Sequence, residues 1–349
     1  MSTLDYKSGV FKALLVTAAL FVVLAGIKTA TNILVPFLLS VFIAIICNPL
    51  VKKIEGFKIP KPLAVVGVII VFVVIVISLA GLVGSSLTEL SRLLPEYREQ
   101  LKGEYIWVIN QLAAFNITLS SDLLVEYFDP GAAMGLAADM LSGLGAVMAN
   151  LFLIVITVIF MLFEAPSLPQ KVHLALDDPE MRMKQIDQFL SSVNHYLAIK
   201  TLVSIATGVC VSLMLWAFGL DFYLLWGVLA FLLNYIPNIG SIIAAVPAMS
   251  LAVLQLGIAP AAFIGLGFLG INTVMGNVVE PRYLGRGLGL STLVVFLSLI
   301  FWGWLLGTVG MLLSVPLTMI IKIGLESSQD GKWIAILLSG DVEEQIKAN

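Results

Sequence analysis

Charged side chains are scarce in this chain. Only 12% of its 349 residues are Asp, Glu, Lys or Arg, against roughly 25% in an ordinary soluble domain, whereas 60% are hydrophobic. The two cysteines and two histidines are too few and too isolated in the sequence to build a disulfide framework or a metal cluster. The net charge of -3, with no block of basic residues, gives no indication of nucleic-acid binding. This composition predicts a membrane protein with several spans.

Enzyme motifs are missing from the sequence as well. It contains no Gly-rich phosphate loop, no His-Glu-x-x-His and no Gly-x-Ser-x-Gly. Because there is no ATP-binding motif, any transport has to use an ion gradient or run downhill. We therefore expect no enzyme activity, no cofactor and no bound metal.

Six apolar runs are long enough to cross a membrane, which takes about 20 residues in a helix. These expected full spans are residues 10–27, 33–50, 63–84, 141–163, 197–219 and 260–279. The first run is not followed by a small-residue cleavage site, so we expect it to stay in place as a span. The expected fold class is all-α.

Two longer apolar stretches, residues 222–256 and 290–323, are interrupted at residues 234–240 and 303–310. Each stretch is too long for one span, so we expect two broken helical hairpins. A hairpin of this kind either enters and leaves the membrane on one side or crosses it twice. Arms of about 14 to 17 residues reach roughly 21 to 25 Å, less than a hydrocarbon core of about 30 Å, and this length favours re-entry.

The spans divide the chain into four expected parts. Residues 1–84 form N-terminal transmembrane helices, residues 85–140 a small helical extracytoplasmic cap, residues 141–323 a transport core and residues 324–349 a cytoplasmic tail. Within the core, Asp178-Pro179-Glu180 is typical of a helix N-terminus, and apolar residues follow at helical spacing. Residues 178–198 are therefore predicted to be an amphipathic helix along the inner membrane surface, serving as a connector, a gate or a subunit contact.

Lysines and arginines predict the orientation of the chain. The loop after the second span is rich in lysine, between residues 52 and 61, which indicates that it is cytoplasmic. Counting spans in both directions places the N-terminus and the C-terminus in the cytoplasm. The mainly acidic segment 85–140 then lies outside, and a bacterial inner membrane is the expected compartment.

The break in the first hairpin contains Asn234, Pro237, Asn238 and Gly240. Pro237 lacks a backbone donor, so freed carbonyl and amide groups need partners nearby. Irregular backbone at membrane depth is tolerated only inside protein or beside a water-filled cavity, and transporters bind substrate at such tips. These four residues are candidates for substrate binding. The alternative is a tight interfacial turn in which the asparagines cap the helices.

The second hairpin weakly repeats the first. Both contain a Trp-Gly pair, then an apolar residue followed by glycine, and then a Val-Pro pair. The matched positions are Trp226, Gly227, Ile239, Gly240, Val246 and Pro247 in the first hairpin, and Trp302, Gly303, Val309, Gly310, Val315 and Pro316 in the second. Paired interruptions indicate a transport site, but these residue types are common in membranes, and chance is an equal alternative.

A third polar segment, residues 272–291, carries three of the four formal charges found between residues 201 and 321. Asn277 and Glu280 are three residues apart and share a helix face, so an amide and a carboxylate could bind hydroxyl groups or a cation together. Asn272 lies five residues before Asn277 and points about 140° away from it unless the helix is distorted. We expect Asn272, Asn277 and Glu280 to be substrate-binding residues.

Arginines and glycines follow this segment directly. Arg282 and Arg286 lie four residues apart and could neutralise Glu280 or contact lipid phosphate, while Gly285 and Gly287 belong to a glycine-rich turn. The alternative is a positive-inside anchor at the cytoplasmic surface. Anchoring explains both arginines without a ligand, so the site prediction rests on the neighbouring amides.

Four of these motifs resemble the autoinducer-2 exporter family of membrane permeases, and most of all its enterobacterial branch. They are FLLNYIPNIGS at residues 231–241, GNVVEPR at 276–282, GRGLGLS at 285–291 and WGWLLG at 302–307. The resemblance implies an inner-membrane exporter of the quorum-sensing signal autoinducer-2, a small polyhydroxylated molecule. It also implies contact with membrane lipid and a homo-oligomer, for which a pentamer is one candidate. Asn carboxamides suit such a solute because they donate and accept hydrogen bonds.

Three functions are therefore compared. In the leading hypothesis, the hairpin tips 234–240 and 304–310 and the segment 272–286 enclose the solute and move in an elevator-like manner against the early spans. The first alternative is a sodium/proton antiporter in which Glu280 and Asp221 titrate, an activity that the resemblance also allows. The second is a membrane scaffold without transport, which binds partners through the outer cap and the cytoplasmic helix.

Overall fold

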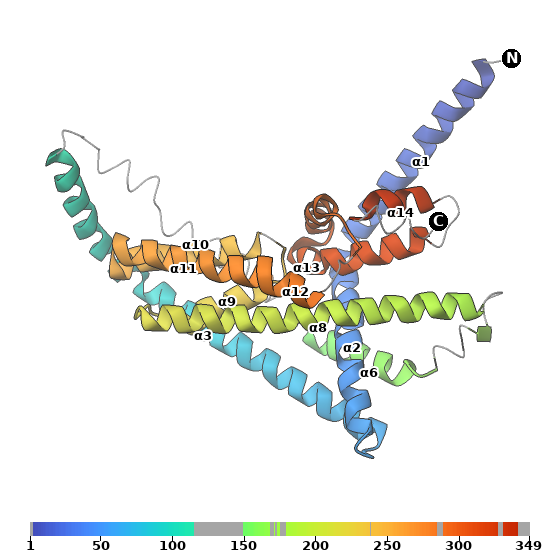
Figure 1. Ribbon diagram of the computed structural model, residues 1–349, viewed down its shortest axis with the longest axis horizontal. Helices are drawn as coiled ribbons and strands as arrows, with labels where there is room; N and C mark the ends of the chain where they lie inside the picture. Colours follow the sequence, from blue (N-terminus) through green and yellow to red (C-terminus); the bar gives the residue numbers. More distant parts are fainter. Residues whose placement is uncertain are drawn as a thin grey trace.

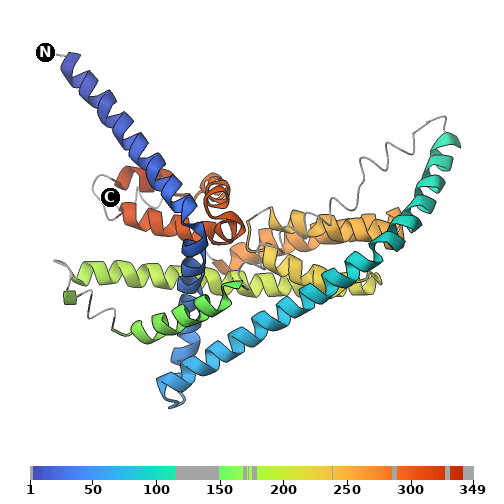
Figure 2. The ribbon, with the colours of Figure 1, turned by 180° about the vertical axis from the view of Figure 1, so that it is seen from behind.

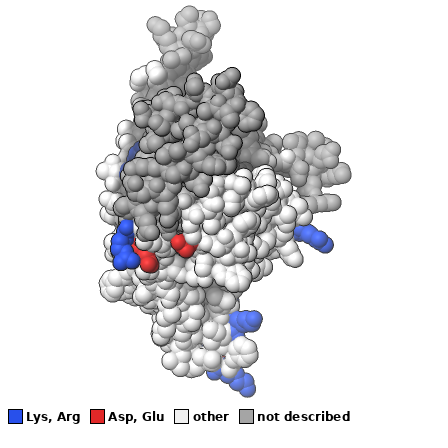
Figure 3. Space-filling model, turned by 90° about the vertical axis from the view of Figure 1, so that its left-hand side faces the viewer, with Lys and Arg blue, Asp and Glu red and all other residues white. Residues whose placement is uncertain are grey.

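The computed structural model describes residues 3–114, 149–167, 171, 173–174, 179–237, 239–284, 289–326 and 331–340. Every regular element in this part of the chain is a helix, which confirms the all-α prediction. Many Leu, Val, Ile and Phe side chains are exposed there, a surface that lipid covers and water disfavours. On the face shown in Figure 3, most of the described surface is uncharged. The chain is a multi-pass membrane protein.

Three of the N-terminal helices, α2, α3 and α6, surround one apolar cluster. Helix α1 extends away from the rest of the molecule in both ribbon views (Figures 1 and 2). Helix α2 packs against α3 and α6, where Cys47, Val65 and Val158 are buried. The bounds of these helices are α1 (Thr3–Thr29), α2 (Thr31–Glu55), α3 (Lys61–Ala114) and α6 (Leu151–Glu164).

The second half of the chain forms a bundle in which α8, α9, α10 and α11 run side by side (Figures 1 and 2). Its core contains Trp226 from α9, Leu251 from α10 and Ile264 from α11, all fully buried. The elements are α8 (Pro179–Ala217), α9 (Tyr223–Leu233), α10 (Gly240–Leu256), α11 (Ile258–Val274), the π-helix η1 (Met275–Val279), α12 (Glu280–Leu284), α13 (Thr292–Glu326) and α14 (Lys332–Leu338).

Five of the described helices are long and apolar enough to cross a membrane. They comprise Thr31–Glu55, Lys61–Leu90, Leu190–Ala217, Ile258–Tyr283 and Thr292–Glu326. The first four overlap the expected spans at residues 33–50, 63–84, 197–219 and 260–279. The expected spans at 10–27 and 141–163 overlap the shorter apolar stretches Leu14–Thr29 and Leu151–Glu164, and residues 141–148 lie outside the described residues.

Two helices continue further than the sequence predicted. Helix α3 runs for 54 residues, so the start of the expected outer cap is a direct continuation of the third span. The remainder of the cap, residues 115–140, lies outside the described residues. Helix α8 runs for 39 residues without a break, and both views show it nearly straight. The expected amphipathic helix and the following span are therefore one helix, because no helix-breaking residue separates them, and the position of residues 178–198 along the membrane surface stays a prediction.

Both expected hairpin breaks are present. Residues 234–239 separate α9 from α10. In α13 the backbone at Gly307 is non-helical, with φ of 70° and ψ of -153°, inside the expected interruption. The flanking glycines allow close approach, since a methyl group at Gly240 would collide with the carbonyl of Leu233, and one at Gly310 with the carbonyl of Trp302. Glycine at these two positions is therefore required by packing.

Candidate functional site

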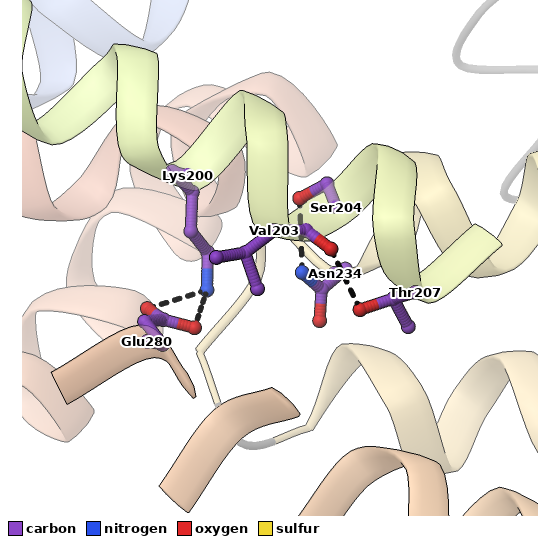
Figure 4. A network of polar contacts seen from close by, with 6 residues as sticks. All are labelled: Lys200, Val203, Ser204, Thr207, Asn234 and Glu280. Atoms are coloured by element: carbon purple, nitrogen blue, oxygen red, sulfur yellow. Dashed lines mark hydrogen bonds and ion pairs between the residues drawn. The ribbon is translucent and has the colours of Figure 1, made fainter. Parts of the chain in front are cut away.

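A buried ion pair links α8 to α12. The Lys200 ammonium lies 2.8 Å from both carboxylate oxygens of Glu280, a residue 80 positions away in the sequence (Figure 4). The side chains of Lys200 and Glu280 are only 4% and 18% exposed. Charges removed from water in this way are tolerated when each satisfies the other. The pair therefore holds α12 in a fixed position against α8.

Polar residues continue along the same face of α8. Ser204 and Thr207 follow Lys200 at i+4 and i+7, the spacing of one helix face. The Asn234 side-chain amide donates to the Ser204 hydroxyl at 2.9 Å, and Asn234 is 8% exposed. Its amide oxygen points away from Ser204, while the Thr207 hydroxyl donates to the Val203 carbonyl at 2.8 Å (Figure 4). We call Lys200, Ser204, Asn234 and Glu280 the α8 polar cluster.

The break after α9 is held to α8 by a second contact. The Tyr235 hydroxyl donates to the Thr201 hydroxyl at 2.7 Å. Within the break, the amide of Ile239 donates to the carbonyl of Pro237 at 2.7 Å, so the turn satisfies part of its own backbone. Two neighbouring residues of the tip, Asn234 and Tyr235, thus attach it to two positions one turn apart on α8.

The π-helix between α11 and α12 places Glu280 in this cluster. The amide of Glu280 donates to the carbonyl of Met275, five residues back instead of the four of an α-helix. The sequence required a distortion here if Asn272 and Asn277 were to share a ligand, and a distortion is present. Asn272 is half-buried and Asn277 is exposed, and the polar contacts among the described residues include neither carboxamide.

The structure places the predicted site residues in different positions. Asn234 and Glu280 join the α8 polar cluster, and Pro237 and Gly240 shape the turn beside it. Arg282 is exposed, and within the described residues it is Lys200 that neutralises Glu280. Four predicted residues lie outside the described residues: Asn238, Gly285, Arg286 and Gly287.

Lys200 is the residue that sequence reasoning missed. It directly precedes a long apolar run, which is the ordinary place for a positive charge at the cytoplasmic end of a span. Two features of the sequence could have indicated Lys200. The Glu280 carboxylate lies in an apolar segment and requires a counter-charge, and small hydroxyl residues follow Lys200 at i+4 and i+7. These hydroxyls mark the face on which Lys200 lies.

Comparison with known proteins gives the family. The family model described as "AI-2E family transporter" matches residues 14–329. The chain is 47% identical to "AI-2 transport protein TqsA" of Escherichia coli (strain K12) over 328 residues, which cover 94% of this chain and 95% of that protein. It is 44% identical to a "Putative transport protein" of Haemophilus influenzae, with 95% and 97% coverage, and 42% identical to "Putative transport protein YhhT" of E. coli (strain K12), with 93% of each covered. The chain belongs to the AI-2E transporter family.

Proposed function

We propose that this protein exports autoinducer-2, a small polyhydroxylated solute, across the bacterial inner membrane. The observation that carries the proposal is the α8 polar cluster, a set of buried polar groups at a helix break inside an otherwise apolar bundle. The similarity to a protein named for AI-2 transport supplies the solute. An amide, hydroxyls and a neutralised ion pair suit a solute that offers several hydroxyl groups.

The arrangement of contacts supports alternating access. Asn234 and Glu280 belong to separate elements, α9–α10 and α12, and both are held to α8 by side-chain contacts alone. Exchanging these contacts for contacts to solute hydroxyls would loosen the hairpin tip from α8, and breaking the Tyr235–Thr201 hydrogen bond as well would free it. In this proposal the hairpins move in an elevator-like way, and the early helices α1, α2, α3 and α6 form the static, oligomeric part.

The topology of the proposal follows from the lysine-rich loop after α2. With that loop in the cytoplasm, the N- and C-termini are cytoplasmic, α2 and α6 begin on the outer side, and the first hairpin enters from the outside. The second hairpin then enters from the cytoplasm. The exposed Asp221 in the turn before α9 fits a solvated outer position.

Replacing Asn234 by alanine is expected to lower autoinducer-2 export roughly tenfold, because the tip loses its amide at the cluster. Asn277→Ala tests the exposed carboxamide on the π-helix and is expected to lower export less, without effect on folding. Export of the signal from cells is measured against the amount of protein in the membrane. Thr157→Ala is the control, since among the described residues the Thr157 hydroxyl donates only to its own helix, at the Leu153 carbonyl. Normal export by both asparagine variants would remove them from the site.

The buried ion pair gives a specific reason to test cation/proton antiport as a second function. A carboxylate beside an ammonium can exchange this partner for a metal cation. If the displaced ammonium then lost its proton, cation binding would be coupled to proton release. In proteoliposomes with a pH gradient, an antiporter takes up sodium and Glu280→Gln abolishes this uptake. Our proposal expects labelled autoinducer-2 flux and no gradient-driven sodium flux in the unaltered protein. The scaffold hypothesis predicts that neither solute moves.

A further inference from the structure

A small pocket lies at the tip of the second hairpin. Its volume is 180 Å³, and it is bounded by the start of α2, the residue before α6, and the break in α13. Thr31, Asn32, Asn150 and Thr308 contribute polar side chains to its lining. Apolar residues make up the rest of the lining: Val35, Pro36, Leu39, Ile154, Leu306 and Val309. We call this space the α13 tip pocket.

Two contacts join the hairpin tip to the junction of α1 and α2 beside this pocket. The Thr31 hydroxyl, which donates to the Lys28 carbonyl at 2.7 Å, also lies 3.3 Å from the carbonyl of Leu305. The Lys28 ammonium lies 4.3 Å from the centre of the Trp304 ring. Gly307, between them and Thr308, has the positive φ that breaks α13. The tip is thus attached to the junction of α1 and α2, as the first tip is attached to α8.

The lining defines the chemistry of a ligand. The lining contains two carboxamides and two hydroxyls, groups that both donate and accept hydrogen bonds, and no charged side chain of the described residues takes part in it. A neutral solute with several hydroxyl groups matches these groups. The lining itself offers an ion or a phosphate no counter-charge, since the Lys28 ammonium beside the tip lies over the Trp304 ring. The volume is below the range of about 300 to 1,000 Å³ that drug-sized ligands occupy, so the ligand is small.

The α13 tip pocket is separate from the α8 polar cluster. None of its lining residues belongs to α8, α9, α10 or α12, which supply the cluster. In the orientation proposed above, α2 and α6 begin on the outer side, so the pocket opens toward the outside. The first hairpin enters from that side, so its broken tip, and the cluster with it, faces the cytoplasm.

We propose that the α13 tip pocket is a second binding site for the transported polyhydroxylated solute, on the outer side of the translocation pathway. This inference rests on the proposed export function and adds a site to it. Asn32 and Thr308 are the residues that bind the solute there, and solute leaving the α8 polar cluster occupies this site before release. The purified protein therefore binds two molecules of autoinducer-2 per chain.

The test measures equilibrium binding of labelled autoinducer-2 to the purified full-length protein. Thr308→Val and Asn32→Ala are expected to weaken one of the two sites about fivefold each, and their combination to leave one site per chain. Asn234→Ala weakens the other site. Thr308→Val is nearly isosteric, which protects the test against misfolding, and Thr157→Ala again serves as the control.

A labelling experiment tests the position of the pocket. Thr308→Cys, in a chain carrying Cys47→Ala and Cys210→Ala, is expected to react with a membrane-impermeant maleimide from the outer face, and autoinducer-2 slows the reaction. Binding of one molecule per chain that Asn32→Ala and Thr308→Val leave unchanged would overturn the inference while the export function stands. Absence of any autoinducer-2 binding and flux would instead overturn the proposed function, and the second site with it.

Discussion

Replacing Lys200 by alanine is expected to destabilise the protein by about 3 to 5 kcal/mol and to abolish transport. The variant leaves the Glu280 carboxylate at the same place without its partner, and that side chain is only 18% exposed. A buried charge that loses its counter-charge costs far more than the pair contributes. Equilibrium unfolding of the purified protein and signal export from cells measure the two effects separately.

Two control variants test whether the effect comes from burial and from charge. Lys171 also pairs with a glutamate, Glu164, but both side chains are more than half exposed, so Lys171→Ala is expected to leave stability unchanged. The double variant Lys200→Met with Glu280→Gln removes both charges and is expected to recover most of the stability but not the transport. If Lys200→Ala unfolds like the unaltered protein, Glu280 is not held by this pair. Normal transport by the neutral double variant would make the pair purely structural.

Gly307→Ala is expected to cost about 1 to 3 kcal/mol and to lower export strongly, because its backbone conformation is almost closed to other residues. With φ of 70° and ψ of -153°, Gly307 occupies a region that a Cβ atom makes unfavourable, although space around it is open. The substitution therefore acts on the backbone alone. It favours a straightened α13, which would withdraw Leu305 and Thr308 from the start of α2.

A matched glycine provides the control for this prediction. Gly81 lies within α3 and also has open space around it, but its φ is not positive. Gly81→Ala is expected to leave export unchanged and to stabilise the helix slightly, since alanine is the better helix former by roughly 1 kcal/mol. Unfolding midpoints and export are compared in the two variants. Equal behaviour of Gly307→Ala and Gly81→Ala would show that the break in α13 does not depend on glycine.

Much of the fold could be predicted because its helices and their interruptions have local causes. Pro237 and Gly240 interrupt the first hairpin, and Gly307 lies inside the interval predicted for the second. The weak repeat between the two hairpins includes the close backbone contacts of Gly240 and Gly310. It does not include the hydrogen bonding of the two tryptophans. Trp302 donates to the Thr318 hydroxyl at 3.0 Å, whereas the buried Trp226 indole has no hydrogen-bond partner among the described residues.

The sequence could predict only those site residues that stand out within their own segment. Asn234 and Glu280 were identified because a polar side chain in an apolar run is unusual by itself. Their partners could not be assigned, since Lys200 and Ser204 come from another helix, 80 and 30 positions away in the sequence. The continuity of α8 was not predicted, because its sequence changes from amphipathic to uniformly apolar. Such a change indicates different surroundings along the helix and does not require a bend.

The π-helix before Glu280 has one more consequence. A wide turn holds an extra residue, and a return to ordinary α-helical hydrogen bonding would advance every later residue by about 1.5 Å and rotate it by about 100°. Pro281 cannot donate a backbone hydrogen bond, so α12 resists this change less than an unbroken helix would. Such a shift of register would turn Glu280 away from Lys200 without moving α8 or α11. A change of one residue in this turn would therefore be enough to separate the two charges.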